Sequence, residues 1–145
     1  MKNILVATDG SEDAARAVAF AAELANQNSA TLIIANVIGN SDFPGDLFQQ
    51  MSSAQHAWLE ESLSAESARV LKGARQQAQA AGVPQIELES RRGSPAPTII
   101  EIAEDHHADA IVIGKRGQGQ LQGLLLGSVS QKLASLAKQV VIVVP

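Results

Sequence analysis

The chain of 145 residues contains no cysteine. Without cysteine there is no disulfide bond, no catalytic thiol and no metal site built on thiolates. The absence also suits a protein of a reducing compartment.

Basic clusters and long apolar runs are missing too. No basic run is longer than Arg91-Arg92, and the formal net charge is −4, which argues against a nucleic acid or an anionic membrane as partner. No apolar run is long enough to span a bilayer. The opening MKNILVATDG carries no cleavage region, and Asp9 soon interrupts its apolar run, so we read it as a strand and not as a signal peptide. We therefore expect a cytoplasmic protein.

What the chain does contain is an alternation of apolar runs and helical spacing. Most of the runs do not alternate with polar residues, which indicates strands buried on both faces, and Gly93-Ser94-Pro95 predicts the start of a helix. We expect a single domain over residues 1–145, of the α/β class. It should be a five-stranded parallel doubly wound (flavodoxin/Rossmann-like) sheet of order 3-2-1-4-5 with helices on both faces. The five runs are Ile4–Ala7, Thr31–Val37, Ile86–Leu88 with its flanks, Ala110–Ile113 and Val140–Val144.

The most informative stretch reads AIVIGKRGQGQLQGLLLGSVSQKLASLA, from Ala110 onward. It predicts a strand, a glycine-rich loop from Gly114 to Gly123, and a helix. Glycine allows positive φ and a close backbone approach, and the free amides at the helix start near Gly127 attract anions, so the pattern predicts a phosphate site. The spacing fits neither a Walker loop nor a dinucleotide fingerprint, because Lys115 directly follows the first glycine and the first strand ends in ATDGSEDA.

The acidic turn after the first strand and the glycine loop after the fourth should meet. In the expected order these two strands are neighbours whose connections leave in opposite directions, and ligands bind beyond the carboxyl ends at such a point. Asp9 and Gly114 mark those two ends.

Gly114, Gly117, Gly127 and Ser128 follow the pattern Gly, two residues, Gly, nine residues, then Gly and Ser. With this pattern the chain resembles the universal stress protein family, in the branch that binds ATP. The resemblance extends over the whole chain through ILVATDGS, ANVIG, GSPAPTII, ADAIVIGKRG, LLGSVSQKL and VVIVV.

The resemblance implies an ATP site, with these residues in the following places. Ala7, Thr8 and Asp9 would lie at the ribose and phosphate side, and Val37 would lie under adenine, reading its edge with backbone groups. The loop would wrap the ribose and the first phosphates, and the helix start would hold the outer phosphates. The loop residues are Gly114, Lys115, Arg116, Gly117, Gln118, Gly119 and Gln120, and those of the helix start are Gly127, Ser128, Val129 and Ser130.

Two parts of this assignment have alternatives. Asp9 either faces Mg²⁺ or the ribose hydroxyls, or it only serves the turn and the helix after Ser11. Lys115 and Arg116 either attract phosphate or lie in solvent.

Other reactive residues give weaker signals. His106 and His107 are adjacent near an expected helix end, so their side chains diverge and do not share a metal, and we predict no metal site beyond Asp9 with Mg²⁺. No partnered Ser, His and Asp set is visible, so we expect no catalytic residue. The stretch Gly39 to Trp58, which holds three of the four aromatic residues, is either a lid or partner site or a cover for the core edge.

Several functions remain open on the sequence alone. The first is a regulatory or stress-response module that binds ATP with Mg²⁺ and a protein partner without efficient catalysis. The second is a slow Mg-dependent ATPase or phosphotransferase, and a third, a phospho-acceptor receiver domain, lacks the acidic pair and the closing lysine. We also expect a homodimer, as the resemblance implies, through the flat apolar edge of Val140, Val141, Ile142, Val143 and Val144.

Overall fold

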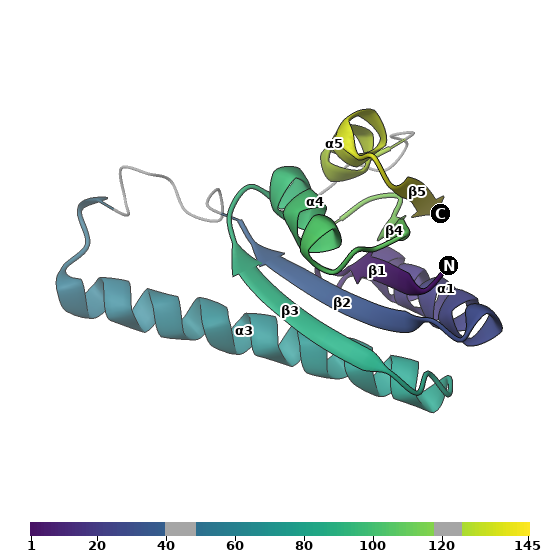
Figure 1. The fold of residues 1–145 in the computed structure, drawn as a ribbon. Coiled ribbons are helices and arrows are strands. Elements are labelled where there is room, and N and C mark those ends of the chain that lie inside the picture. Colours follow the sequence, from purple (N-terminus) through teal and green to yellow (C-terminus); the bar gives the residue numbers. More distant parts are fainter. Residues whose placement is uncertain (40–48, 118–125) are drawn as a thin grey trace.

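The computed structural model describes residues 1–39, 49–117 and 126–145. Within these ranges the chain alternates strands and helices (Figure 1). The strands are β1 (Asn3–Ala7), β2 (Thr31–Ile38), β3 (Ile86–Arg92), β4 (Ala110–Gly114) and β5 (Val140–Val144). The helices are α1 (Glu12–Asn28), α3 (Ser53–Ala80), α4 (Pro95–Asp105) and α5 (Ser128–Leu136).

The five strands form one parallel sheet of order β3-β2-β1-β4-β5. This confirms the predicted fold class and strand order. β1 lies in the middle and pairs with β2 on one side and β4 on the other. The two connections that leave these neighbours run in opposite directions, so a crevice opens beyond their carboxyl ends.

Helices cover both faces of the sheet (Figure 1). One core cluster packs under α1 and α3, and a second packs under α4 and α5. Successive side chains of a strand belong alternately to the two clusters. In β1, Ile4 and Val6 belong to the first cluster, and Leu5 and Ala7 to the second. A strand buried on both faces needs apolar side chains at successive positions, which explains the unbroken apolar runs.

A serine precedes α1, α3 and α4, whereas Gly127 precedes α5. The side chain of Ser11 accepts a hydrogen bond from the Ala14 amide, and Ser52 forms a reciprocal capping box with Gln55. Ser94 occupies the predicted cap position before α4, but its side chain makes no capping bond there. Pro95, at the start of that helix, has no N–H group to satisfy, which lessens the need for a capping bond.

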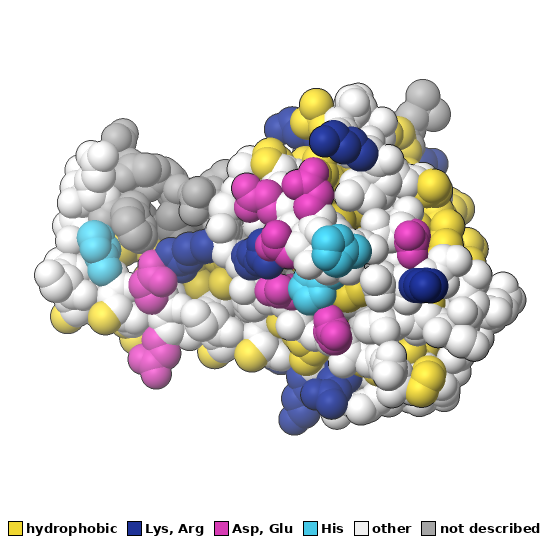
Figure 2. Space-filling model, in the orientation of Figure 1, with side chains coloured by type: hydrophobic (Ala, Val, Ile, Leu, Met, Phe, Trp, Pro, Cys, Tyr) yellow, Lys and Arg dark blue, Asp and Glu magenta, His cyan; other side chains and the backbone are white. Residues whose placement is uncertain are grey.

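β3 departs from the apolar pattern because it lies at the edge of the sheet. It carries charged residues, and His106 at the end of α4 bridges two of them: its ring nitrogens lie 3.0 Å from Glu87 and 2.8 Å from Glu89. Arg91 joins the same network through Glu89 and Asp105. Acidic, basic and histidine side chains gather accordingly on this face (Figure 2). Charges on an edge strand discourage pairing with another chain.

None of the helices in the described ranges has the length and apolar character that crossing a bilayer requires.

Candidate functional site

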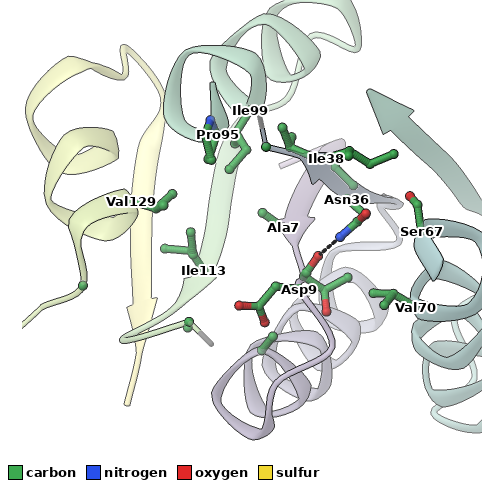
Figure 3. A pocket seen from close by; sticks show the side chains of 18 of the residues that line it. Ala7, Asp9, Asn36, Ile38, Ser67, Val70, Pro95, Ile99, Ile113 and Val129 are labelled. Atoms are coloured by element: carbon green, nitrogen blue, oxygen red, sulfur yellow. Dashed lines mark hydrogen bonds between the residues drawn. The ribbon is translucent and has the colours of Figure 1, made fainter. Parts of the chain in front are cut away.

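A cavity of about 420 Å³ lies beyond the carboxyl ends of β1, β2 and β4. Its walls come from the turn after β1, the end of β2, one side of α3, the start of α4, and the start of α5 (Figure 3). The Asp9 turn and the Gly114 loop therefore meet at one crevice, as the strand order predicts.

Most of the residues predicted from the sequence line this cavity. Lys115 does not, and Gln118, Gly119 and Gln120 lie outside the described residues. The predicted residues that line it are Ala7, Thr8, Asp9, Val37, Gly114, Arg116, Gly117, Gly127, Ser128, Val129 and Ser130.

Side-chain hydrogen bonds hold the turn after β1 in place. Asp9 Oδ1 accepts from the Ser11 amide at 2.9 Å, and Thr8 Oγ1 accepts from the Gly10 amide at 3.2 Å. One carboxylate oxygen of Asp9 thus has the turn role considered from the sequence. The other oxygen, Oδ2, lies beside Gly117, on the cavity wall. Both roles weighed for Asp9 are compatible with this geometry.

Gly114 and Gly117 are needed for space and not for an unusual backbone angle. Neither is among the described glycines with positive φ, which are Gly10, Gly82 and Gly93. A Cβ atom on Gly114 would lie 2.9 Å from the backbone carbon and oxygen of Asp13 in the first turn of α1. A Cβ atom on Gly117 would lie 2.6 Å from Asp9 Oδ2. The first glycine lets a helix pack against a strand, and the second leaves room for a carboxylate.

Hydrogen bonds join the start of α5 to the end of β4. The Gly127 amide donates to the Lys115 carbonyl at 2.8 Å. The Ser130 hydroxyl donates toward the carbonyls of Gly114 and Lys115, at 2.9 and 3.2 Å. The hydroxyl proton of Ser130 is therefore directed to the backbone and not to the cavity. The amides of the first helical turn have no partner within the helix and supply the positive end of its dipole.

Arg116 lines the cavity, and its guanidinium group lies close to the carboxylate of Asp13. Its Nε lies 3.6 Å from Asp13 Oδ2, and the Arg116 side chain is 30% exposed. Arg116 is thus close to a carboxylate, and Lys115 is not part of the cavity lining.

Sequence reasoning missed the wall contributed by α3 and by Asn36 of β2. Asn36 is buried, and its side-chain amide donates to the Thr8 carbonyl at 2.8 Å, tying β2 to the turn after β1 (Figure 3). Ser67 and Val70 reach the same cavity from α3. Asn36 carried a signal, since it is the one polar residue in the run LIIANVI. Nothing in the α3 sequence indicates which residues of its long face meet the cavity.

Metal-binding clusters are absent from the part of the chain that the structure describes: no three His, Asp or Glu side chains are arranged to hold an ion. A single carboxylate such as Asp9 fits Mg²⁺ that arrives with phosphates, because Mg²⁺ is commonly held by one or two carboxylates together with substrate phosphates.

Comparison with known proteins places this geometry in a family. The model of the universal stress protein family matches residues 1–145. A universal stress protein of Methanocaldococcus jannaschii is 34% identical over 145 residues, covering 99% of this chain and 81% of the relative. One from Thermus aquaticus is 34% identical over 137 residues, covering 94% of this chain and 93% of the relative.

Solved structures agree with these matches. A universal stress protein in complex with cAMP has a TM-score of 0.73 and 32% identity, and the match covers 99% of this chain and 95% of that one. Universal stress protein UspA from Lactobacillus plantarum has a TM-score of 0.83 and 29% identity, with 99% and 97% covered. With the family model matched from end to end and the expected fold and crevice in place, the chain belongs to the universal stress protein family.

Proposed function

We propose that this chain binds an adenine nucleotide such as ATP in the crevice and acts as a regulatory module in a stress response. The convergence of the Asp9 turn, the end of β2, Gly117 and the start of α5 on one cavity carries the proposal. The cAMP complex of a relative that is 32% identical supports it, because that protein shares the fold over nearly its whole length.

Each wall of the cavity supplies one kind of contact. The backbone groups of Val37 at the end of β2 would read the edge of adenine. Asp9 would accept hydrogen bonds from ribose hydroxyls or face a Mg²⁺ ion brought by the phosphates, and Mg²⁺ would offset phosphate charge. The first-turn amides of α5 would hold a phosphate.

A binding role is favoured over efficient catalysis by the groups present. Besides Asp9, the described lining has one other carboxylate, Glu66, which is paired with Arg69, and the Ser130 hydroxyl donates to backbone carbonyls. The alternative is a slow Mg-dependent ATPase or phosphotransferase that uses the same pocket.

The proposal includes a homodimer formed through β5, a cytoplasmic location and a protein partner of unknown identity. β5 is an edge strand, so its outer backbone groups are open to pairing. The Val144 carbonyl accepts from the Lys115 amide at 2.8 Å, so Val144 faces β4. Because successive residues direct their backbone groups to opposite sides, Val141 and Val143 present theirs to the open edge.

Gly117→Val tests the site directly. The new side chain would push the Asp9 carboxylate out of its position while leaving the helix contacts of Gly114 intact. We expect a loss of at least about tenfold in affinity for ATP, as judged from the value of one to two lost polar contacts. Isothermal titration calorimetry measures it, with circular dichroism to confirm folding. Gly73→Val on the exposed side of α3 is the control, because nothing lies within 4 Å of a Cβ atom there. Unchanged ATP affinity in folded Gly117→Val would refute the assignment.

A further inference from the structure

The backbone of β2 loses its neighbour on one side at the point where β1 ends. Successive residues of a parallel strand direct their backbone N–H and C=O groups to opposite neighbours in the sheet. The Thr8 amide donates to the Ala35 carbonyl at 2.9 Å, and the Gly93 amide donates to the Ile38 carbonyl at 3.0 Å. Ala35 therefore faces the β1 side of the sheet, and Ile38 faces β3. Val37, two residues after Ala35, must face the β1 side as well.

No strand residue lies beside Val37 on that side. The last paired residues of β1 and β2 are Ala7 and Ala35. If the parallel ladder continued, the Val37 amide would donate to the Thr8 carbonyl. In the described ranges no backbone hydrogen bond joins these two groups. Val37 lines the cavity, so its backbone N–H and C=O are directed toward the cavity and not toward a strand.

The side chain of Asn36 occupies the acceptor that the Val37 amide would otherwise use. Its amide nitrogen donates to the Thr8 carbonyl at 2.8 Å (Figure 3). Asn36 is 9% exposed, so loss of this bond would leave a buried carbonyl in need of another donor. Leu32 and Ile34, on the same face of β2, belong to the apolar core cluster under α1 and α3. A polar side chain at the next position of that face therefore calls for a specific role.

We propose that Asn36 is a positioning residue for the nucleotide base: by bonding the Thr8 carbonyl, it keeps the backbone N–H and C=O of Val37 open to the cavity. This inference rests on the proposed function and names the residue that holds the end of β2 ready for adenine. Asn36 acts through Val37 and not by contact with the ligand. Without the Asn36 amide, Val37 donates to the Thr8 carbonyl, and the cavity loses that donor.

Hydrogen exchange of the ligand-free protein, followed by NMR, tests the state of the Val37 amide. In the parent it should exchange at least about tenfold faster than the Thr8 amide, which is bonded to Ala35. In Asn36→Leu, which has no donor, the Val37 amide should become about as protected as that of Thr8. A Val37 amide that is already so protected in the parent, or that does not respond to the substitution, would overturn the proposal.

Two further variants secure this measurement. Asn36→Ala removes the same donor without adding bulk and should give the same change, so the test does not depend on the folding of one variant. Asn26 in α1 makes the same kind of bond, from its side-chain amide to the Ala81 carbonyl at 2.6 Å, and lies outside the cavity lining. Asn26→Leu should leave the exchange of the Val37 amide unchanged, and an equal response to both substitutions would count against a role specific to Asn36.

Calorimetry with ATP and inosine triphosphate tests the consequence for binding. The two ligands share their ribose and phosphates, but inosine presents a carbonyl and an N–H group where adenine presents an amino group and an unprotonated nitrogen. The open N–H and C=O of Val37 match adenine only, so the parent should prefer ATP at least about tenfold. In Asn36→Leu this preference should fall below about threefold, because the donor is withdrawn.

The outcomes separate positioning from a merely structural role. A structural role would weaken both nucleotides by the same factor, so equal losses in Asn36→Leu, or equal affinities in the parent, would overturn the proposal and leave the proposed function standing. Failure of both nucleotides to bind the parent would overturn the proposed function itself.

Discussion

Replacing Gly114 by alanine should destabilise the fold through one steric contact. Gly114 ends β4 and is buried, and its backbone is not in the left-handed region, so alanine suits the local conformation. The added Cβ atom, however, would lie 2.9 Å from the carbonyl carbon and oxygen of Asp13 and 3.1 Å from the Ala14 nitrogen. These are backbone atoms of α1, so no side chain can turn aside, and the helix must shift away from the sheet.

Two opposing terms set the size of the effect. Overpacking of a well-packed core costs about 1–3 kcal/mol, and a contact with helix backbone belongs near the upper end. Alanine also reduces the freedom of the unfolded chain, which restores about 0.4–1 kcal/mol. The steric term wins, and we expect a net loss of about 2 kcal/mol in the free energy of unfolding. For domains near this size that lowers Tm by about 4–8 °C.

Urea and thermal unfolding followed by circular dichroism measure the loss, with Gly73→Ala as the matched control. Gly73 lies inside α3 with nothing within 4 Å of its Cβ position, so alanine there should raise stability by about 0.5–1 kcal/mol. A Gly114→Ala protein as stable as the parent would refute the close packing of α1 on β4.

Three further outcomes follow from the described contacts. Light scattering should find a dimer for the parent and a monomer for a Val143→Pro variant, because proline removes an amide from the open edge of β5; a parent that stays monomeric at high micromolar concentration would reject the interface. Phosphate release with Mg²⁺ should take minutes per turnover, far below the roughly 1–10³ per second of typical enzymes; a rate near one per second, lost in Asp9→Asn with ATP binding kept, would instead establish an ATPase. Burial opposes ionisation of Glu89, but hydrogen bonds and charge from His106 and Arg91 outweigh it and lower its pKa. Since the unfolded carboxyl titrates near 4.5, Glu89 stabilises the fold above that pH and ceases to do so as the pH falls through the lower folded value. Urea unfolding of Glu89→Gln should therefore show a deficit at pH 7 that shrinks as the pH falls below 4.5, and a deficit that stays constant as the pH falls would count against the network.

The strands and their order were predictable because they depend on local and topological rules. Apolar runs without alternation require burial on both faces, and parallel strands joined by helices leave few arrangements. Once β1 and β4 are neighbours, the ends marked by Asp9 and Gly114 lie at the same edge of the sheet. The convergence of distant segments at the crevice therefore followed from the pattern.

What the sequence left undetermined depends on packing between elements. Ser67 and Val70 reach the cavity because of the angle at which α3 crosses the sheet, which no spacing within α3 specifies. The direction of the Ser130 hydroxyl depends on which carbonyls lie next to the first turn of α5. The outward direction of the Val143 amide depends on the register between β4 and β5.

The glycine pattern combines two separate physical requirements. Gly114 is required by the packing of α1 against β4, whether or not a ligand binds, whereas Gly117 is required only by the position of the Asp9 carboxylate. A substitution at the first glycine should therefore act on stability and, through it, on binding. One at the second should act mainly on binding, with a smaller effect on the turn that Asp9 Oδ1 holds through the Ser11 amide. A related chain that keeps Gly114 but carries a larger residue in place of Gly117 should fold in the same way and lose the nucleotide. Of the two glycines, only Gly117 therefore bears directly on the proposed nucleotide site, because it leaves room for the Asp9 carboxylate on the cavity wall.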